Sequence, residues 1–388
     1  INFGPGATPY SPTELTGSFT PAVDFGEEYQ HINAQLWGEF APAKNATLPY
    51  ASQVAPYNIP PDAGTPSMSG FVTDYASAFR EQTGGRVPTR EELAQVMGYL
   101  SPSLVPTFQT LAREFGVYDQ WYCDVPSNTY ANRSFFQSGQ SYGMLNSNPG
   151  WPLKTTKAPT IFARLSSHGV PWKVYWSPSQ EVSTTLIVNW RGICHFYNGG
   201  SGDHWASMEQ FYDDAARGEL PKYSFIEPRI WFDNNDMHPT LPISSLGQTY
   251  ASSRSYVTAA DRLLHDVYDA IRRSSSPSGS RAENTLLLVT FDEHGGSHDH
   301  VVPLPAAPPD QSIGEFDFRF DRLGVRIPTM AISSHIEPGT IVSDPMMGTS
   351  VMATLQEKWK LGGPLTNRDA SAPLFTPIIN RKTARPAS

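Results

Sequence analysis

The chain has 388 residues, of which 39% are hydrophobic and 17% are charged, as is typical of a folded globular protein. Its formal net charge of −9 is not balanced by any basic stretch, which argues against a general nucleic-acid binder. No apolar run approaches the ~18 residues that a membrane-spanning helix requires, so the sequence predicts no transmembrane segment.

Residues 1–85 form a loop-rich portion in which one helix is predicted, around Glu27 to Trp37. The first residues, INFGPGATPYSP, have neither the basic region nor the apolar region of a signal peptide. A sequon at Asn45 is a candidate glycosylation site. The two cysteines, Cys123 and Cys194, suit either one disulfide in a secreted protein or two thiols in a cytosolic one.

Two helices are predicted next along the chain. The stretch PTREELAQVMGYL (88–100) has Thr89 as a candidate N-cap and acidic residues in its first turn. From Leu104 to Phe115, apolar residues recur at spacings of four, three and four, which indicates an amphipathic helix. This helix leads into the loop DVPSNTYANRSFFQSG (124–139).

From residue 160 onward, helices and strands alternate. The stretch TLLLVTFDE (285–293) lacks polar alternation, which is typical of a strand covered by helices on both faces. The pattern predicts an α/β fold, with a doubly wound, mostly parallel sheet and helices on both faces. In such sheets, ligands bind beyond the carboxyl ends of the strands. The predicted helices are 160–169, 204–220, 258–274 and 349–359, and the predicted strands are 171–177, 222–228, 285–293 and 326–333.

A cluster of acidic and imidazole side chains follows the strand at 285–293. Asp292, Glu293 and His294 are followed by two glycines and, after a serine, by HDH (298–300). Carboxylates and imidazoles suit a divalent cation, and glycines let the backbone approach a ligand closely. A capped polar loop is the alternative interpretation. Neighbouring strand residues point to opposite faces, so Asp292 and Glu293 can share one ion only if the strand has ended.

Two earlier segments carry further candidate residues. In Asp236-Met237-His238-Pro239, the proline holds His238 extended, as suits an imidazole aimed into a cleft. The stretch SNTYANR (127–133) offers hydroxyl, amide and guanidinium groups, which suit the attack and binding of a phosphate. Taken alone, each segment suits an ordinary surface loop equally well. The remaining histidines are expected to be structural: His31, His168, His195, His204, His265 and His335.

In this order, the three segments resemble the phosphoesterase family of non-haemolytic phospholipases C and acid phosphatases, a branch of the alkaline phosphatase superfamily. The resemblance rests on LVPTFQTLAREFGVYDQWYCDVPSNTYANRSFFQSG (104–139), on ELPKYSFIEPR with the following Met237-His238-Pro239, and on TLLLVTFDEHGGSHDHV (285–301). It covers Asp24 to His300, and more loosely extends to Trp359. It implies one alkaline phosphatase-like domain over residues 1–388.

The resemblance also implies a mechanism. Thr129 would attack phosphorus and form a covalent phospho-threonine, and Asp292 and Glu293, with Thr129, would bind one or more divalent metal ions. His238 and His300 would bind phosphate or protonate the leaving group. The substrate-binding residues that it implies are Asn132, Arg133, His294, His298 and Glu27, with Glu227 and Arg229 as a supporting pair.

Two departures from the family pattern bear on activity. The family begins with a strand and a Glu-Asn-Arg-Ser-Phe-Asp motif that completes the metal site, and this sequence has no such motif. Truncation, cleavage, a separate N-terminal segment or loss of the metal site would each explain this. In addition, Phe25-Gly26-Glu27 stands where the family often has Pro-Gly-His. A carboxylate there repels phosphate unless it binds a cation or recognises a different substrate.

The leading hypothesis is therefore metal-dependent hydrolysis of a small-molecule phosphate ester or a phospholipid headgroup, in the manner of a phospholipase C or an acid phosphatase. The alternative is a non-hydrolytic or catalytically altered member of the fold that binds or transforms a different ligand in the same cleft. A sulfatase-like hydrolase would need an oxidised Cys or Ser nucleophile, and Cys123 lies six residues from Thr129. The family habit and the Asn45 sequon favour a secreted protein.

Overall fold

The computed structural model describes residues 9–17, 21, 23–38, 64–148, 150–180, 182–197, 204–239, 242–245, 248–251 and 256–385. The sequon at Asn45 lies outside these residues. The second sequon begins at Asn132, whose side chain is buried, so it offers no site for a glycan.

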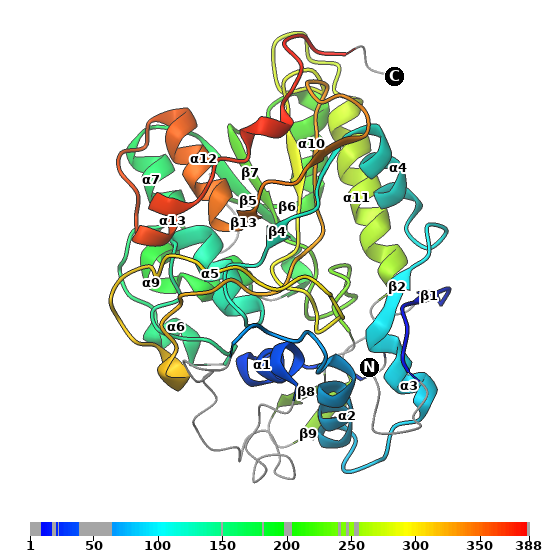
Figure 1. The fold of residues 1–388 in the computed structure, drawn as a ribbon. Coiled ribbons are helices and arrows are strands. Elements are labelled where there is room, and N and C mark those ends of the chain that lie inside the picture. Colours follow the sequence, from blue (N-terminus) through cyan, green and yellow to red (C-terminus); the bar gives the residue numbers. More distant parts are fainter. Residues whose placement is uncertain are drawn as a thin grey trace.

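Three parallel strands form a sheet in the order β6-β5-β7 (Figure 1). β5 (Trp172–Trp176) pairs with β6 (Trp205–Ser207) at one edge and with β7 (Tyr223–Ile226) at the other. Aromatic and β-branched residues dominate β5 and suit a buried strand. The strands predicted at 171–177 and 222–228 are confirmed. β6 corrects the prediction, because its three residues had been assigned to the helix that follows directly.

Helices cover both faces of this sheet (Figure 1): α7 (Ile161–Ser167) and α12 (Thr349–Trp359) cover one face, and α10 (Met208–Arg217) and α11 (Val257–Arg272) cover the other. Trp172, Val174 and Trp176 share a buried cluster with α7 and α12. Tyr175, on the opposite face of β5, packs with α10 and α11. The alternation of side chains along one strand thus produces a helix–sheet–helix arrangement.

A second sheet has the order β10-β11-β3-β12 and mixes both strand directions. β10 (Leu287–Val289) is antiparallel to β11 (Thr329–Ile332), which is antiparallel to β3 (Gly116–Tyr118). β3 is parallel to β12 (Thr340–Val342). An α/β fold with helices on both faces is therefore observed, but a single doubly wound, mostly parallel sheet is not confirmed. The reason is that strand pairing depends on contacts between residues far apart in sequence.

The N-terminal portion packs onto this body through α1 (Tyr29–Trp37) and α2 (Phe71–Gln82). Their buried faces share a cluster with Phe25, Val96 and Val325, which anchors the segment that precedes α1. Thr89 caps α3 (Arg90–Ala94) in a capping box with Glu92, as the sequence predicted for this N-cap. In this way a loop-rich segment obtains a fixed position beside the sheet.

The remaining α-helices and β-strands of the described residues surround these parts. They are β1 (Thr13–Leu15), β2 (Gly98–Leu100), α4 (Pro106–Glu114), β4 (Trp121–Tyr122), α5 (Thr129–Ser138), α6 (Trp151–Lys154), α8 (Thr184–Val188), α9 (Trp190–Ile193), β8 (Pro242–Ser245), β9 (Gln248–Ala251), β13 (Met346–Met347) and α13 (Asn367–Ser371). Cys123 and Cys194 are free thiols, so the two are not bonded. Among the described helices, none combines the length and apolar character needed to cross a bilayer.

Candidate functional site

A cavity of about 1660 Å³ runs along the whole of β7 and β10 and extends past the ends of both strands. Two segments far apart in sequence meet there, the loop that begins α5 and the polar cluster after β10. In α/β proteins, ligands bind beyond the carboxyl ends of the strands, and this meeting point lies there. The residues predicted from sequence that line the cavity are Thr129, Asn132, Arg133, His238, Asp292, Glu293, His294 and His298.

Thr129 is the first residue of α5, and its neighbours hold the preceding loop in place. The buried Asn132 side chain accepts from the Val125 backbone N–H at 3.0 Å and donates to the Ser127 carbonyl at 2.6 Å. Its polar atoms therefore bind the loop, which assigns Asn132 a positioning role. The partial positive charge at the start of α5 favours an anion next to Thr129.

Arg133 lies between two carboxylates that follow different strands. Its Nε donates to Asp292 Oδ2 at 2.9 Å, and its Nη1 lies 3.9 Å from Glu227 Oε2. Nη1 is buried and has no hydrogen-bond partner among the described residues. One N–H group of the guanidinium thus remains available to a phosphate oxygen.

Besides its contact with Arg133, Glu227 also binds the start of a helix. Its carboxylate accepts from the backbone N–H groups of Thr184 and Thr185, at 2.7 and 2.8 Å, where α8 begins. Arg229 donates to the Asp233 carbonyl instead. Glu227, which was expected to support the site together with Arg229, thus contacts Arg133, and the supporting role of Arg229 stays a prediction.

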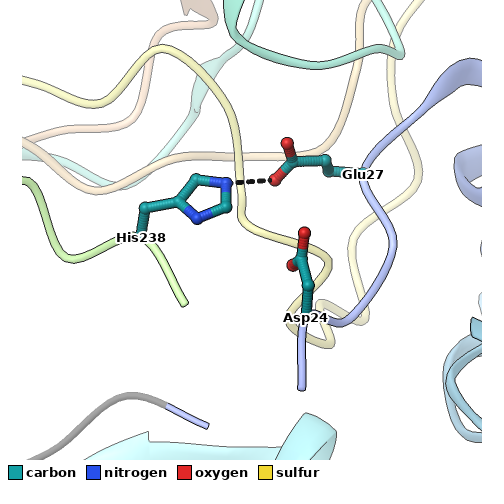
Figure 2. A group of neighbouring side chains, drawn as sticks. All are labelled: Asp24, Glu27 and His238. Carbon is teal, nitrogen blue, oxygen red and sulfur yellow. Dashed lines mark hydrogen bonds and ion pairs between the residues drawn. The ribbon is translucent and has the colours of Figure 1, made fainter. Parts of the chain in front are cut away.

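Glu27 and His238 form a buried ion pair, with Nε2 and Oε2 2.9 Å apart (Figure 2). His238 Nδ1 lies 2.8 Å from the Pro239 carbonyl oxygen, which can only accept a hydrogen bond. Burial alone would lower the pKa of His238, but the Glu27 carboxylate outweighs it and raises this pKa well above its usual value. Each ring nitrogen thus faces a hydrogen-bond acceptor, and this arrangement favours the imidazolium form of His238.

Asp24 completes a group of three possible ligands with Glu27 and His238 (Figure 2). One ligand atom from each of them lies within 4.8 Å of the others. Asp24 Oδ1 is buried without a hydrogen-bond partner in the described structure. Burial, followed by the nearby charge of Glu27, raises the pKa of Asp24 to about 6. No local sequence motif marks Asp24 as a candidate ligand.

Glu293 lies in the same electrostatic environment. Burial raises its pKa well above the usual range, and the charges of Glu27 and Asp292 add to this effect. Like charges in a buried site disfavour ionisation unless a cation compensates them. The carboxylates of Asp24, Glu27, Asp292 and Glu293 lie near one another, and one oxygen of Asp24 has no hydrogen-bond partner among the described residues. This group of oxygen ligands therefore fits a divalent cation.

Gly296 allows the segments of Glu27 and Glu293 to meet. Gly296 has a φ of +70°, and a Cβ there would lie 2.5 Å from Phe25 Cβ and 2.7 Å from the Gly26 carbonyl oxygen. The glycines after Glu293 were expected to admit a ligand. Gly296 instead admits the backbone that precedes Glu27.

His294 belongs to a buried network under the site. Its Nε2 lies 2.9 Å from Gln35 Oε1, and Gln35 Nε2 donates to the Gly26 carbonyl at 2.7 Å. Burial lowers the pKa of His294 to about 4, so its imidazole is neutral at neutral pH. Gln35 was not predicted as a site residue, because it lies inside α1, where a single glutamine forms no recognisable motif.

His298 and His300, the last two predicted histidines, lie in different environments. The His298 ring packs edge-on against Phe71, with ring centroids 5.1 Å apart, and lines the cavity. His300 has a side chain that is 81% exposed and lies against Asp299, and it does not line the cavity. The structure thus does not bring His300 to the other predicted residues, and its role in phosphate binding stays a prediction.

Comparison with protein families matches residues 8–362 to the Phosphoesterase family. Non-specific phospholipase C6 of Arabidopsis thaliana is 34% identical over 342 residues, covering 82% of this chain and 58% of that protein. Non-specific phospholipase C4 of the same plant is 32% identical over 343 residues, covering 84% of this chain and 57% of that protein. The chain thus spans less than two thirds of the length of these relatives.

More distant similarities exist as well. Phospholipase C A of Mycobacterium tuberculosis (strain ATCC 25618 / H37Rv) is 28% identical over 304 residues, covering 71% of this chain and 54% of that protein. Among solved structures, a Vibrio parahaemolyticus protein in the alkaline phosphatase superfamily is 16% identical. The match covers 71% of this chain and 65% of that protein, with a TM-score of 0.37.

Proposed function

The chain belongs to the phosphoesterase family, and on this premise we propose that it hydrolyses phosphoric diesters in the manner of a phospholipase C, through a covalent phospho-threonine at Thr129. One observation carries the proposal. A helix-start hydroxyl, a guanidinium with an unpartnered N–H and a protonated imidazole line one cavity. These groups match the three needs of phosphoryl transfer, namely a nucleophile, a phosphate clamp and a general acid.

The reaction has two halves. Thr129 Oγ forms a bond to phosphorus and loses its proton to solvent, while the bond from phosphorus to the leaving alcohol breaks. His238 gives its proton to the departing alkoxide, and Glu27 supports the imidazolium until that moment. Water then attacks the phosphorus of phospho-threonine, releases the phosphorylated headgroup and restores the Thr129 hydroxyl.

Arg133 and the start of α5 act on the phosphate itself. The unpartnered Nη1 donates to a phosphoryl oxygen, while the bond from Nε to Asp292 fixes the plane of the guanidinium. Asn132 keeps the backbone before Thr129 in one conformation through its bonds to Val125 and Ser127. This positioning limits the motion of the nucleophile before attack.

A divalent cation is part of the proposal. Asp292 and Glu293 would hold it, as the family resemblance implies, and Asp24 and Glu27 supply further carboxylates nearby. When bound, the cation lowers the pKa of the attacking hydroxyl and offsets charge on the phosphoryl oxygens.

Calorimetric titration of the protein with Mn²⁺ tests the cation site separately from activity. We expect Asp24→Asn to weaken binding at least about tenfold, because it removes a buried carboxylate whose oxygen lacks another partner. Asp266→Asn, on the exposed side of α11, is the matched control and should bind like the unaltered protein. Unchanged Mn²⁺ affinity in Asp24→Asn would remove Asp24 from the site.

Substitution of Thr129 tests the nucleophile. Thr129→Ala should lower kcat at least about 10³-fold, because no other group replaces the attacking oxygen. Thr129→Ser keeps a hydroxyl and should retain measurable turnover. Mass spectrometry of acid-quenched protein should find a phosphoryl adduct on Thr129, and an adduct on another residue would contradict the assignment.

The substrate class is tested with paired chromogenic esters. p-Nitrophenyl phosphorylcholine, a diester, should be hydrolysed faster than p-nitrophenyl phosphate, a monoester, and phosphatidylcholine vesicles should release phosphocholine. A preference for the monoester would favour an acid phosphatase. Measurements should include the longer natural polypeptide, if one exists, as well as residues 1–388.

A second candidate is a catalytically altered member of the family. The observation that favours it is the ion pair between Glu27 and His238, which engages a histidine predicted to meet phosphate. In that case neither ester class is turned over at any Mn²⁺ concentration, and Glu27→His changes ligand preference without restoring hydrolysis.

A further inference from the structure

Residues 145–148 connect two parts of the candidate site that are far apart in sequence. On one side they bind the loop before Thr129, and on the other side they bind the chain just after Glu27. The segment itself is held at Leu145, which is fully buried and whose N–H donates to Glu315 Oε2 at 2.9 Å. Both contacts therefore come from one anchored piece of chain.

Ser147 caps α5 from outside the helix. Asn128 occupies the N-cap position of α5, but its side chain does not bond back to the helix. Asn128 Oδ1 instead accepts from the N–H and from the hydroxyl of Ser147, both at 3.0 Å. The Ser147 oxygen in turn accepts from the Tyr130 N–H at 3.2 Å, as an N-cap side chain usually does. The residue next to Thr129 is thus fixed by a hydroxyl from another segment.

Buried contacts on either side of Thr129 add to this cap. Before it, the Ser127 hydroxyl, which is fully buried, donates to the Leu145 carbonyl at 2.8 Å. After it, the Tyr130 ring packs edge-on against the buried Trp151, with ring centroids 5.5 Å apart. The segment that carries Ser147 therefore supports the chain around Thr129 from both directions.

Asn146, the residue before Ser147, binds the start of α1. Its Oδ1 accepts from the Tyr29 N–H at 3.0 Å, and its Nδ2 donates to Gln30 Oε1 at 2.9 Å. Tyr29 is the first residue of α1, and the chain reaches it directly from Glu27 through one intervening residue. Because Glu27 is the partner of His238 (Figure 2), a shift of the α1 start would move this carboxylate away from the imidazole.

We propose that Asn146 and Ser147 are positioning residues, which together set the separation between Thr129 and the Glu27–His238 pair. This inference rests on the proposed function, in which Thr129 is the nucleophile and His238 is the general acid. Both groups must stand roughly in line with the phosphorus, so their separation decides whether they act on the same phosphate. Asn146 and Ser147 are not among the residues that line the cavity, so they act through the residues that they hold.

Substitution of Ser147 tests the support of the nucleophile. Ser147→Ala should fold, because Ser147 is exposed, and urea unfolding checks this. With p-nitrophenyl phosphorylcholine and Mn²⁺, it should lower kcat about tenfold and change KM less than about twofold, because the attacking oxygen loses alignment while the phosphate-binding groups remain. Ser147→Thr keeps the hydroxyl and should restore kcat. Ser167→Ala removes a comparable exposed hydroxyl, which bonds to Arg164 in α7, and is the matched control with unaltered kinetics.

Substitution of Asn146 tests the support of the general acid through the pH profile. Asn146→Ala releases the Tyr29 N–H, so Glu27 is held less firmly against His238, and the basic limb of kcat/KM should move at least about 0.5 pH unit lower. Asn146→Asp keeps an oxygen acceptor and should leave the limb at its original pH or above it. Ser147→Ala should lower kcat without moving this limb.

The outcomes separate this inference from the function on which it rests. If the unaltered protein hydrolyses neither a diester nor a monoester at any Mn²⁺ concentration, the proposed function fails, and the positioning role fails with it. If the unaltered protein is active and both alanine variants keep its kcat and its pH profile, only the positioning role is overturned. Equal losses of kcat in the two variants with an unmoved basic limb would show a general structural role, which also overturns it.

Discussion

At the residue scale, His238 shows how two neighbours fix a protonation state. The Pro239 carbonyl and the Glu27 carboxylate each accept from one ring nitrogen, so the imidazolium is the form that satisfies both. A general acid must hold its proton at the working pH and release it only to the leaving group. In the proposed mechanism, Glu27 thus extends the pH range over which His238 can donate its proton.

Glu27→Gln should therefore shift the basic limb of the pH–activity profile toward lower pH. The acid is active when protonated, so activity falls as the pH rises through the pKa of His238. Without the carboxylate, burial lowers that pKa, and the limb should move by at least about one pH unit. The measurement is kcat/KM against pH at saturating Mn²⁺.

Glu28→Gln is the control for this experiment. Glu28 is the next residue along the chain, but its carboxylate lies 3.9 Å from His31. Its profile should retain the basic limb of the unaltered protein. If Glu27→Gln also retains that limb, His238 is not the acid of the rate-limiting step.

At the element scale, the turn after β10 meets the turn before α1 at Gly296. Gly296→Ala should push these turns apart, because the new Cβ meets Phe25 Cβ and the Gly26 carbonyl. We expect a loss of about 2–4 kcal/mol in the free energy of unfolding and a fall in kcat/KM. Urea unfolding and steady-state kinetics measure the two effects.

Gly295→Ala separates close contact from backbone strain. Gly295 also has a positive φ, of +60°, but a Cβ there would meet nothing within 4 Å. Gly295→Ala should lower the free energy of unfolding by about 1 kcal/mol, the usual penalty for an alanine in the left-handed conformation. Equal losses in the two variants would show that contact with the Phe25 turn does not hold the site together.

The elements that local pattern determines were predictable from sequence. Apolar periodicity predicted α7, α11 and α12, and runs of β-branched and aromatic residues predicted β5, β7 and β11. β6 was missed because a three-residue strand that continues into a helix has no pattern of its own. The antiparallel direction of β11 beside β10 was missed because strand direction depends on long connections.

The candidate site was predictable where residues fall into motifs. Thr129, Arg133, His238 and Asp292 lie in short segments that the family resemblance identified, and all of them line the cavity. Asp24 and Gln35 had no such signal, because their significance comes only from packing of the N-terminal portion against the turn after β10. The exposed position of His300 was equally invisible, since sequence proximity to His298 does not fix side-chain direction.

At the scale of the whole molecule, a buried histidine–carboxylate pair under the site links folding to pH. His31 Nδ1 and Asp74 Oδ1 are 2.8 Å apart, and Gln35 also donates to Asp74. Burial lowers the pKa of His31, but Asp74 outweighs it and raises this pKa to about 10. Because Gln35 bonds to Asp74, Gly26 and His294, the pair supports the turns on both sides of the site.

The folded protein therefore binds the His31 proton more tightly than the unfolded chain, whose histidine pKa is about 6.5. The stabilisation is fully present below pH 6.5 and is lost as the pH rises toward about 10. Burial raises the pKa of Asp74 as well, which offsets part of this stabilisation, so we expect a net contribution on the order of 2 kcal/mol to the free energy of unfolding.

This contribution is measured as the free energy of unfolding of the unaltered protein and of His31→Gln at pH 6, 8 and 9.5. The difference between the two proteins should shrink as the pH rises, whereas His265→Gln, on the exposed side of α11, should show no such trend. A difference that stays constant from pH 6 to 9.5 would mean that His31 is neutral in the folded protein and supports the site by packing alone.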